Sequence, residues 1–230
     1  MLKTFVNYGV KRMFKELARE GTFATRSEVH RTYVALKLLR KPTRRTFRTT
    51  DSNHGYKRWT NLMLGLKVTV PDQVWVADVT GIYLDNRPTY LALVMDVFTR
   101  SIVGFSLSPC NDTALTLAAL RMGLGLGRSP EIHHSDHGTN YASDAYTSVL
   151  IGRSIDVSMA AIGTPEENGY AERLNRTVKE EEVRKTCYAS LPDTRQRIAK
   201  YVQYYNKKRI HTSLGYITPS EAFQHFWEAK

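Results

Sequence analysis

Cysteine is almost absent from this chain. Its 230 residues contain only Cys110 and Cys187, which lie far apart and without metal-ligand spacing. Two such residues form neither a disulfide framework nor a zinc site. The chain also lacks a signal-peptide-like apolar segment and any apolar stretch long enough to span a bilayer. These absences argue against a disulfide-rich secreted scaffold and a membrane-spanning protein, and they predict a location in the reducing cytoplasm.

Acidic residues are scarce in the first third of the chain. Residues 1–70 contain 16 Lys and Arg against 4 Asp and Glu, whereas residues 71–230 contain 17 against 18. The formal net charge of +11 therefore comes from the N-terminal part. This distribution is typical of a nucleic-acid-binding segment attached to a near-neutral body. A solvated basic surface is the simpler alternative, and a membrane-surface role is disfavoured because no long basic amphipathic helix is present.

The spacing of apolar residues predicts two helices in the basic region. The first spans residues 8–20 with Gly21 as its stop, and the second spans residues 27–39. A plain helical hairpin packed on the main domain is one interpretation. The other is a helix-turn-helix whose second helix presents to DNA the side chains of Arg26, Glu28, His30 and Arg31.

A basic, polar connector follows these helices. Residues 40–72 contain Pro42, Gly55 and several cations, among them Arg44 and Arg45. We expect this segment to follow a phosphate backbone rather than to build a core. The predicted organisation is a helix-turn-helix-like region at 1–40, a basic linker at 41–71 and a catalytic domain at 72–230.

The main domain alternates predicted strands and helices. Short turns between the first three strands imply an antiparallel meander. The expected strands are 74–84, 90–98, 100–107, 132–134 and 155–159, and the expected helices are 113–126, 143–151 and a long one from about residue 165. This order predicts an α/β RNase H-like fold, with a five-stranded mixed sheet flanked by helices.

Three carboxylates stand out in this pattern. Asp78 interrupts the apolar strand VWVADVTGIYL, and Asp136 lies just past a strand end, where active-site residues of open sheets gather. Glu172 lies on the polar face of the last helix, with Arg176 and Lys179 in the next turns. Oxygen donors brought together by a fold form a Mg²⁺ or Mn²⁺ site. The simpler interpretations are that Asp136 forms a turn or a helix cap and that Glu172 forms a surface ion pair.

Other polar residues nearby receive structural interpretations. Glu167 stands three residues after Thr164, with Pro165 between them, which predicts a capping box at the start of the last helix. Asp96 ends the second strand and is interpreted as a turn former. Three histidines at 133–137 lack the usual ligand spacing, so a zinc site is disfavoured.

The C-terminal segment interleaves aromatic and cationic residues between 201 and 211. It either contacts DNA or closes the last helix of the main domain with a basic outer edge. The candidate DNA contacts in this segment are Lys207, Lys208 and Arg209.

Together these motifs resemble the insertion-sequence-three group of OrfB-type transposases, within the DDE transposase and retroviral integrase superfamily. The resemblance covers nearly the whole chain, and the 35 residues between Asp136 and Glu172 equal the family spacing. One conservative departure is Glu-Asn-Gly at 167–169, where many members carry Asp-Asn-Ala. The motifs include WVADVT at 75–80, HSDHGTNY at 134–141, ENGYAERLNRTVKEE at 167–181 and YYNKKRIHTSLGYITP at 204–219.

The resemblance implies a transposase that cleaves and joins DNA strands at a site made by Asp78, Asp136 and Glu172. It also implies two Mg²⁺ or Mn²⁺ ions, with Arg176 and Lys179 holding the transposon end beside them. The implied partners are DNA, further copies of the chain on DNA, and an upstream-frame protein with another helix-turn-helix and a coiled coil. Two alternatives remain open: a non-catalytic DNA-binding regulator from a decayed element, and a plain RNase H-like nuclease.

Overall fold

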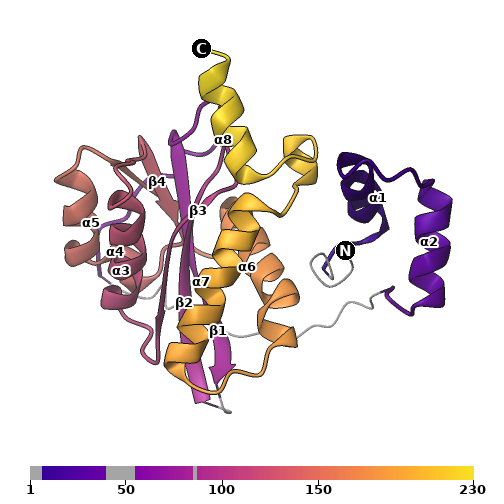
Figure 1. Ribbon diagram of the computed structural model, residues 1–230. Coiled ribbons are helices and arrows are strands. Elements are labelled where there is room, and N and C mark those ends of the chain that lie inside the picture. Colours follow the sequence, from indigo (N-terminus) through magenta and orange to yellow (C-terminus); the bar gives the residue numbers. More distant parts are fainter. Residues whose placement is uncertain (1–6, 40–54, 85–86) are drawn as a thin grey trace.

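A five-stranded mixed sheet forms the centre of the protein, whose computed structural model describes residues 7–39, 55–84 and 87–230 (Figure 1). The strands are β1 (Val74–Leu84), β2 (Arg87–Asp96), β3 (Ile102–Ser108), β4 (Ile132–Ser135) and β5 (Asp156–Met159). Their order is β3-β2-β1-β4-β5, with the first three antiparallel and β4 and β5 added in parallel. The predicted mixed sheet is confirmed.

Helices cover both faces of this sheet. The helices of the main domain are α3 (Thr113–Leu124), α4 (Thr139–Ala142), α5 (Asp144–Ile151), α6 (Gly169–Glu181), α7 (Leu191–Lys207) and α8 (Pro219–Glu228), with 3-10 turns η1 (Pro165–Asn168), η2 (Val183–Lys185) and η3 (Thr212–Leu214). Helices α3, α4 and α5 pack on one face, and α6 and α7 pack on the other (Figure 1). The short helix α4 was not predicted from the sequence.

The side chains of β1 alternate between the two helical layers, as expected for a central strand. Trp75 and Ala77 lie in the core with α3 and α5, whereas Val74 and Val76 lie in the core with α6 and α7. Asp78 has the same parity as the two valines. Its carboxylate therefore lies on the α6 side of the sheet.

Helix α3 packs closely on β3 because Gly104 has no side chain. A Cβ at this position would lie 2.0 Å from the carbonyl oxygen of Ala119 on α3. Any larger residue would therefore push the helix away from the sheet and open the core.

The last long helix begins later than the sequence predicts. A 3-10 turn spans Pro165–Asn168, and α6 follows it. The predicted capping box is wrong, because Thr164 accepts no cap hydrogen bond. The Glu167 carboxylate instead accepts hydrogen bonds from the Ala161 N–H at 2.8 Å and from the Asn61 side chain at 2.7 Å. These bonds lower the pKa of Glu167 and hold the loop before α6.

Two helices of the basic region lie beside the main domain, α1 (Val10–Arg19) and α2 (Arg26–Ala35) (Figure 1). Helix α2 ends before the predicted position because Lys37 has a left-handed conformation, with φ 54°. The two helices pack on the C-terminal segment, and both the helical-hairpin and the helix-turn-helix interpretations stay predictions. The hairpin and the C-terminal segment share a small apolar core of Tyr8, Met13, Val29, Tyr33 and Ile210.

The second half of the predicted linker packs on the catalytic domain. Trp59 contacts the core with α3, and Met63, Leu66 and Val68 contact the core with α6. The Leu62 N–H also donates a hydrogen bond of 2.9 Å to the Ser158 hydroxyl. The expectation that the whole connector stays outside the core is therefore wrong for residues 59–68. Their apolar side chains bury surface that a linker would leave in water.

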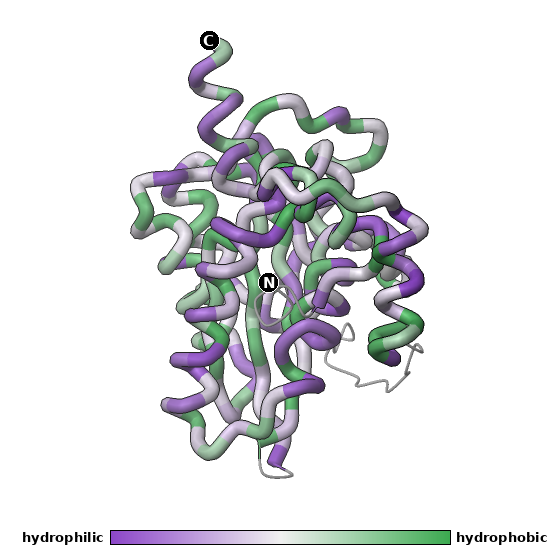
Figure 2. The backbone as a smooth tube through the Cα atoms, turned by 45° about the vertical axis from the view of Figure 1, so that its right-hand side comes forward, coloured by the Kyte–Doolittle hydropathy of each residue, from purple (hydrophilic) through white to green (hydrophobic). Residues whose placement is uncertain are grey.

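Hydrophobic and hydrophilic residues alternate along the chain (Figure 2), and α6 buries its apolar residues Ala171, Leu174 and Val178 against the sheet. In the part of the chain that the structure describes, no helix is long and apolar enough to cross a membrane. Cys110 and Cys187 are both exposed and free.

Candidate active site

The pairing of β1 with β4 places Asp78 beside Asp136. The strands run parallel, and Val76 is paired with His134. Asp78 lies two residues further along β1, and Asp136 follows the end of β4 at Ser135. The side chain of Asp78 points toward α6, because residues two apart in a strand share one face of the sheet. The charge of Asp136 acts on Asp78, so the end of β4 brings two of the three predicted carboxylates close together.

Asp78 is partly buried and hydrogen-bonded through both carboxylate oxygens. Oδ1 accepts from the Val79 N–H at 2.8 Å, and Oδ2 accepts from the Asn175 side chain at 2.7 Å. Burial and the nearby charges of Asp136 and Glu172 raise the pKa of Asp78 to about 8, although its two hydrogen bonds oppose the shift. A carboxyl group with such a pKa lies where negative charges converge and a cation would be favoured.

Asp136 follows directly after β4, in the turn that leads into α4. It is partly buried, and its Oδ1 accepts a hydrogen bond of 3.2 Å from the Gly138 N–H. This bond is the turn role that the simpler interpretation assigns to Asp136. It leaves the position next to Asp78 unchanged, so the residue serves the turn and the site together.

Glu172 lies in the first turn of α6 and is exposed. Its charge acts on Asp78, but it stands further out than Asp136 does. Within residues 7–39, 55–84 and 87–230, no three His, Cys, Asp or Glu side chains are close enough to surround one metal ion. The site therefore has two adjacent carboxylates and a third on the helix that covers them. An all-oxygen donor set with converging negative charge fits a hard divalent cation.

Helix α6 is held against β1 by polar contacts as well as by its apolar side. The Asn168 side chain donates a hydrogen bond of 3.1 Å to the carbonyl oxygen of Ala77, next to Asp78. Asn175 is almost fully buried and holds Asp78 directly. Asn175 was not among the residues predicted from the sequence. Its position three residues after Glu172 could have indicated it, because this spacing places both residues on one side of the helix.

Comparison with known proteins identifies the family. The integrase core domain family matches residues 68–165 and, in a second match, residues 153–219. The transposase for insertion sequence element IS629 of Shigella sonnei is 31% identical over 216 residues, covering 94% of this chain and 73% of the relative. The uncharacterized 31 kDa protein of insertion element IS600, also of Shigella sonnei, is 32% identical over 223 residues, with 95% and 82% covered. The chain belongs to the DDE transposase family.

Solved structures of retroviral integrases share the fold of this transposase. The catalytic core domain of HTLV-2 integrase, solved in complex with magnesium, aligns with a TM-score of 0.56 at 18% identity, covering 68% of this chain and 99% of that one. A simian T-cell lymphotropic virus intasome chain aligns with a TM-score of 0.61 at 17% identity, covering 96% and 73%. At such identities the likeness establishes the RNase H-like fold alone.

Two cations of the transposase continue the polar side of α6. Arg176 is exposed, and Lys179 is partly buried. Burial lowers the pKa of Lys179, and the charge of Asp78 partly opposes that shift. Lys179 therefore lies close enough to Asp78 to interact with its charge. The predicted row of one carboxylate followed by two cations is present on this face.

The neighbouring histidines do not form a metal site. His133 contacts the Tyr146 hydroxyl at 3.0 Å, whereas His134 contacts the Ser158 hydroxyl at 2.8 Å and the carbonyl oxygen of Glu167 at 3.2 Å. The two rings point to opposite faces of the sheet. Burial lowers the pKa of His133 to about 3 and that of His134 to about 4, so both are neutral at physiological pH.

Asp96 is a turn former, as predicted. Its carboxylate accepts hydrogen bonds from the backbone N–H groups of Asp72, Phe98 and Thr99 and from the Thr99 hydroxyl. It also lies 3.5 Å from a guanidinium nitrogen of Arg128. These contacts occupy Asp96 at the β2–β3 turn.

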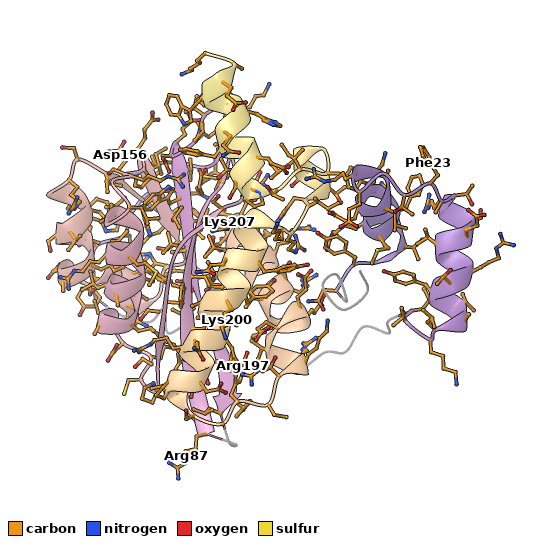
Figure 3. The ribbon with its side chains drawn as sticks, in the orientation of Figure 1. Phe23, Arg87, Asp156, Arg197, Lys200 and Lys207 are labelled. Carbon is orange, nitrogen blue, oxygen red and sulfur yellow. The ribbon has the colours of Figure 1, made fainter. Side chains whose placement is uncertain are left out.

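The prediction that Arg209 contacts DNA is wrong. Arg209 is buried, and its guanidinium donates two hydrogen bonds of 2.8 Å to the Glu181 carboxylate. Arg209 is therefore unavailable to DNA. Lys207 and Lys208 are exposed, and Figure 3 shows the first at the end of α7. No local pattern in the sequence predicts the burial of Arg209, because its partner Glu181 lies 28 residues earlier in the chain, at the end of α6.

The structure describes only some of the predicted DNA contacts in the N-terminal region. Arg26, His30 and Arg31 are exposed on α2 and remain predicted DNA contacts. Glu28 is also exposed and forms a capping box with Thr25 at the start of α2, and its predicted place facing DNA stays a prediction. The predicted contacts at Arg44 and Arg45 lie outside the described residues.

Proposed function

We propose that Asp78, Asp136 and Glu172 form the site at which this transposase cleaves DNA and joins the freed 3′-hydroxyl to a second strand. The observation that carries the proposal is the β1–β4 register, which sets two carboxylates side by side beneath the helix that bears the third. The raised pKa of Asp78 supports it, because the charges of Asp136 and Glu172 both act on this buried carboxyl group.

The three carboxylates would hold Mg²⁺ or Mn²⁺, and we propose two ions. When bound, such ions activate the attacking oxygen and neutralise charge on the leaving 3′-oxygen. The magnesium named for the HTLV-2 integrase core is consistent with this choice. Asn175 would keep Asp78 oriented toward the site, and Arg176 and Lys179 would bind phosphates next to the bond that breaks.

Nicking uses water as the nucleophile, and joining uses the freed 3′-hydroxyl at the same carboxylates. Nicking forms a P–O bond to water and breaks the P–O3′ bond, which leaves a 5′-phosphate and a 3′-hydroxyl. Joining forms a new phosphodiester and breaks the P–O3′ bond of the second strand. In each step the leaving 3′-oxygen takes up a proton and the nucleophile loses one. No residue of the chain needs to bond covalently to DNA.

The test is divalent-metal-dependent nicking and joining of labelled duplexes that carry the flanking ends of the element. Glu172→Gln should lose both activities by on the order of 10³-fold or more, because a metal ligand is removed. Glu180→Gln is the matched control, since Glu180 is an exposed glutamate on the same helix. Full activity in Glu172→Gln would refute the assignment. Nicking without joining in the wild type would favour a nuclease, and binding alone would favour a regulator.

Arg176→Ala and Lys179→Ala should weaken DNA binding without regard to sequence. Each removes one phosphate contact, so the slope of log K against log salt should fall by about one unit per variant. Lys200→Ala is the control, because Lys200 is an exposed cation on α7 (Figure 3). Fluorescence anisotropy at several salt concentrations measures the slopes. An unchanged slope in both α6 variants would contradict the phosphate role.

We further propose membership of the insertion-sequence-three group, supported by the motifs around the three carboxylates. The predicted division at residues 40 and 71 is kept as a proposal, with residues 59–68 packed on the catalytic domain. The partners would be transposon-end and target DNA, further copies of the chain and an upstream-frame protein, in the bacterial cytoplasm. Size measurement of the protein with and without its end DNA tests the assembly.

A further inference from the structure

A pocket of about 850 Å³ lies beside the first turn of α6, apart from the carboxylates. Its walls come from residues 65–68, from the β2–β3 turn at 97–100, from Tyr170 and from the C-terminal segment 213–226. Helix α8, which forms part of this wall, projects at one end of the molecule (Figure 1). Pockets of this size hold small organic ligands.

The pocket is aromatic and basic. No Asp or Glu is among the residues that line it, whereas Lys67, Arg100 and His225 are. Phe98 and Phe226 pack edge to face in its wall, with ring centroids 5.4 Å apart. A flat ligand that carries negative charge matches this lining.

Arg100 and Tyr170 form the polar side of the pocket. The guanidinium lies over the Tyr170 ring, 4.4 Å from its centroid. Its Nη1 is buried and has no hydrogen-bond acceptor among the described residues, and Arg100 makes no ion pair with them. Tyr170 stays 42% exposed, so one side of the stacked pair is open to a ligand.

The pocket lies close to the site of cleavage. Tyr170 precedes Glu172 by two residues on α6, which is about 3 Å along the helix axis. The two side chains leave the helix in different directions, so the pocket and the carboxylates are separated by roughly the width of one helix, about 10 Å. A DNA strand held at the carboxylates can therefore place a neighbouring nucleotide in the pocket.

We propose that this pocket receives an unpaired nucleotide of the DNA strand bound at the carboxylates. The base would stack on Tyr170, above the two phenylalanines, and its phosphate would be bound by Arg100 and Lys67. Stacking of this kind tolerates any base sequence, because every base has a flat face. The inference rests on the proposed function and deepens it. The substrate is a duplex opened next to the bond that is cut.

The test compares two labelled duplexes, one blunt and one with a two-nucleotide unpaired 2-aminopurine flap, in EDTA so that binding is separated from cleavage. The wild type should bind the flap duplex about 5- to 100-fold more tightly and quench the 2-aminopurine by stacking. Tyr170→Ala should lose the preference and the quenching, and Tyr170→Phe should keep both. Tyr83→Ala is the matched control, because Tyr83 is an exposed tyrosine on β1 that does not line the pocket.

The outcomes separate this inference from the proposed function. No flap preference in the wild type, or a preference that survives Tyr170→Ala in a folded protein, overturns the pocket assignment. A change of oligomeric state in Tyr170→Ala without loss of flap preference would assign the pocket to a second copy of the chain instead. Flap binding without metal-dependent nicking would keep the pocket and refute the proposed function. Asp78→Asn, which is expected not to cleave, should keep the flap preference.

Discussion

Asp78→Asn should abolish nicking and joining while stabilising the metal-free protein. The carboxylate is a proposed metal ligand, so its loss should reduce activity by on the order of 10³-fold or more. Its pKa is raised because burial and the charges of Asp136 and Glu172 disfavour the ionised form. A neutral amide removes that unfavourable charge. We expect a gain of on the order of 1–3 kcal/mol in unfolding free energy at alkaline pH without metal.

The amide can satisfy the same hydrogen bonds. Oδ1 of the new side chain can accept from the Val79 N–H, as the carboxylate does now. Its NH₂ group would then face Asn175, whose own Oδ1 is buried without a partner among the described residues. A flip of the Asn175 amide would present this oxygen as the acceptor. The flip moves the Asn175 NH₂ group to the position that its oxygen now occupies, so the hydrogen bond between residues 78 and 175 is kept while the buried charge is removed.

The pH dependence of the unfolding free energy shows whether Asp78→Asn stabilises the protein by removing the Asp78 charge or by another effect. The pKa of Asp78 is about 8 in the folded state against an ordinary value of 3.8, so the folded protein binds more protons between these values. The stability of the metal-free wild type should therefore fall as pH rises through this window, and the fall should be smaller in Asp78→Asn. Urea unfolding in EDTA at pH 5 and pH 8.5 measures it. An equal difference between the proteins at both pH values would contradict the prediction.

Arg209→Ala should destabilise the protein by about 3–5 kcal/mol, because it leaves the buried carboxylate of Glu181 without its main partner. Burial by itself raises the pKa of Glu181, but the hydrogen bonds and charge of Arg209, together with the charge of Arg12 and the hydrogen bond from Tyr201, outweigh burial and lower the pKa. The same carboxylate also accepts from Tyr201 at 3.1 Å and lies 3.4 Å from Arg12 on α1. The pair thus joins the ends of α6 and α7 to the N-terminal hairpin.

Arg197→Ala is the control for this prediction. Arg197 forms an exposed ion pair with Asp193 one turn away on α7 (Figure 3 labels the arginine), and such pairs contribute less than about 0.5 kcal/mol. Chemical denaturation of the two variants gives the difference. A loss in Arg209→Ala no larger than in Arg197→Ala would show that the buried pair does not stabilise the fold. Hydrogen exchange should also show faster exchange in α1 of the Arg209 variant.

Local patterns in the sequence were sufficient for most elements of the main domain. The apolar run VWVADVTGIYL defined β1, and the apolar side of α6 follows from Ala171, Leu174 and Val178, which are all buried. The start of α6 was misplaced because a cap motif depends on backbone angles. Thr164 has φ −114° and ψ 68°, and the nearby carboxylate of Glu167 bonds to a distant loop instead.

The sequence by itself determined the order of strands and helices and the three unusual carboxylates, because these depend on periodicity and on the cost of a charge in an apolar strand. Only the tertiary structure decided which polar groups meet. The β1–β4 register brings Asp136 to Asp78, and packing of α6 brings Asn175 to the same carboxylate. Burial decided that Arg209 binds Glu181 rather than DNA. Such contacts join residues far apart in the chain, so no local pattern encodes them.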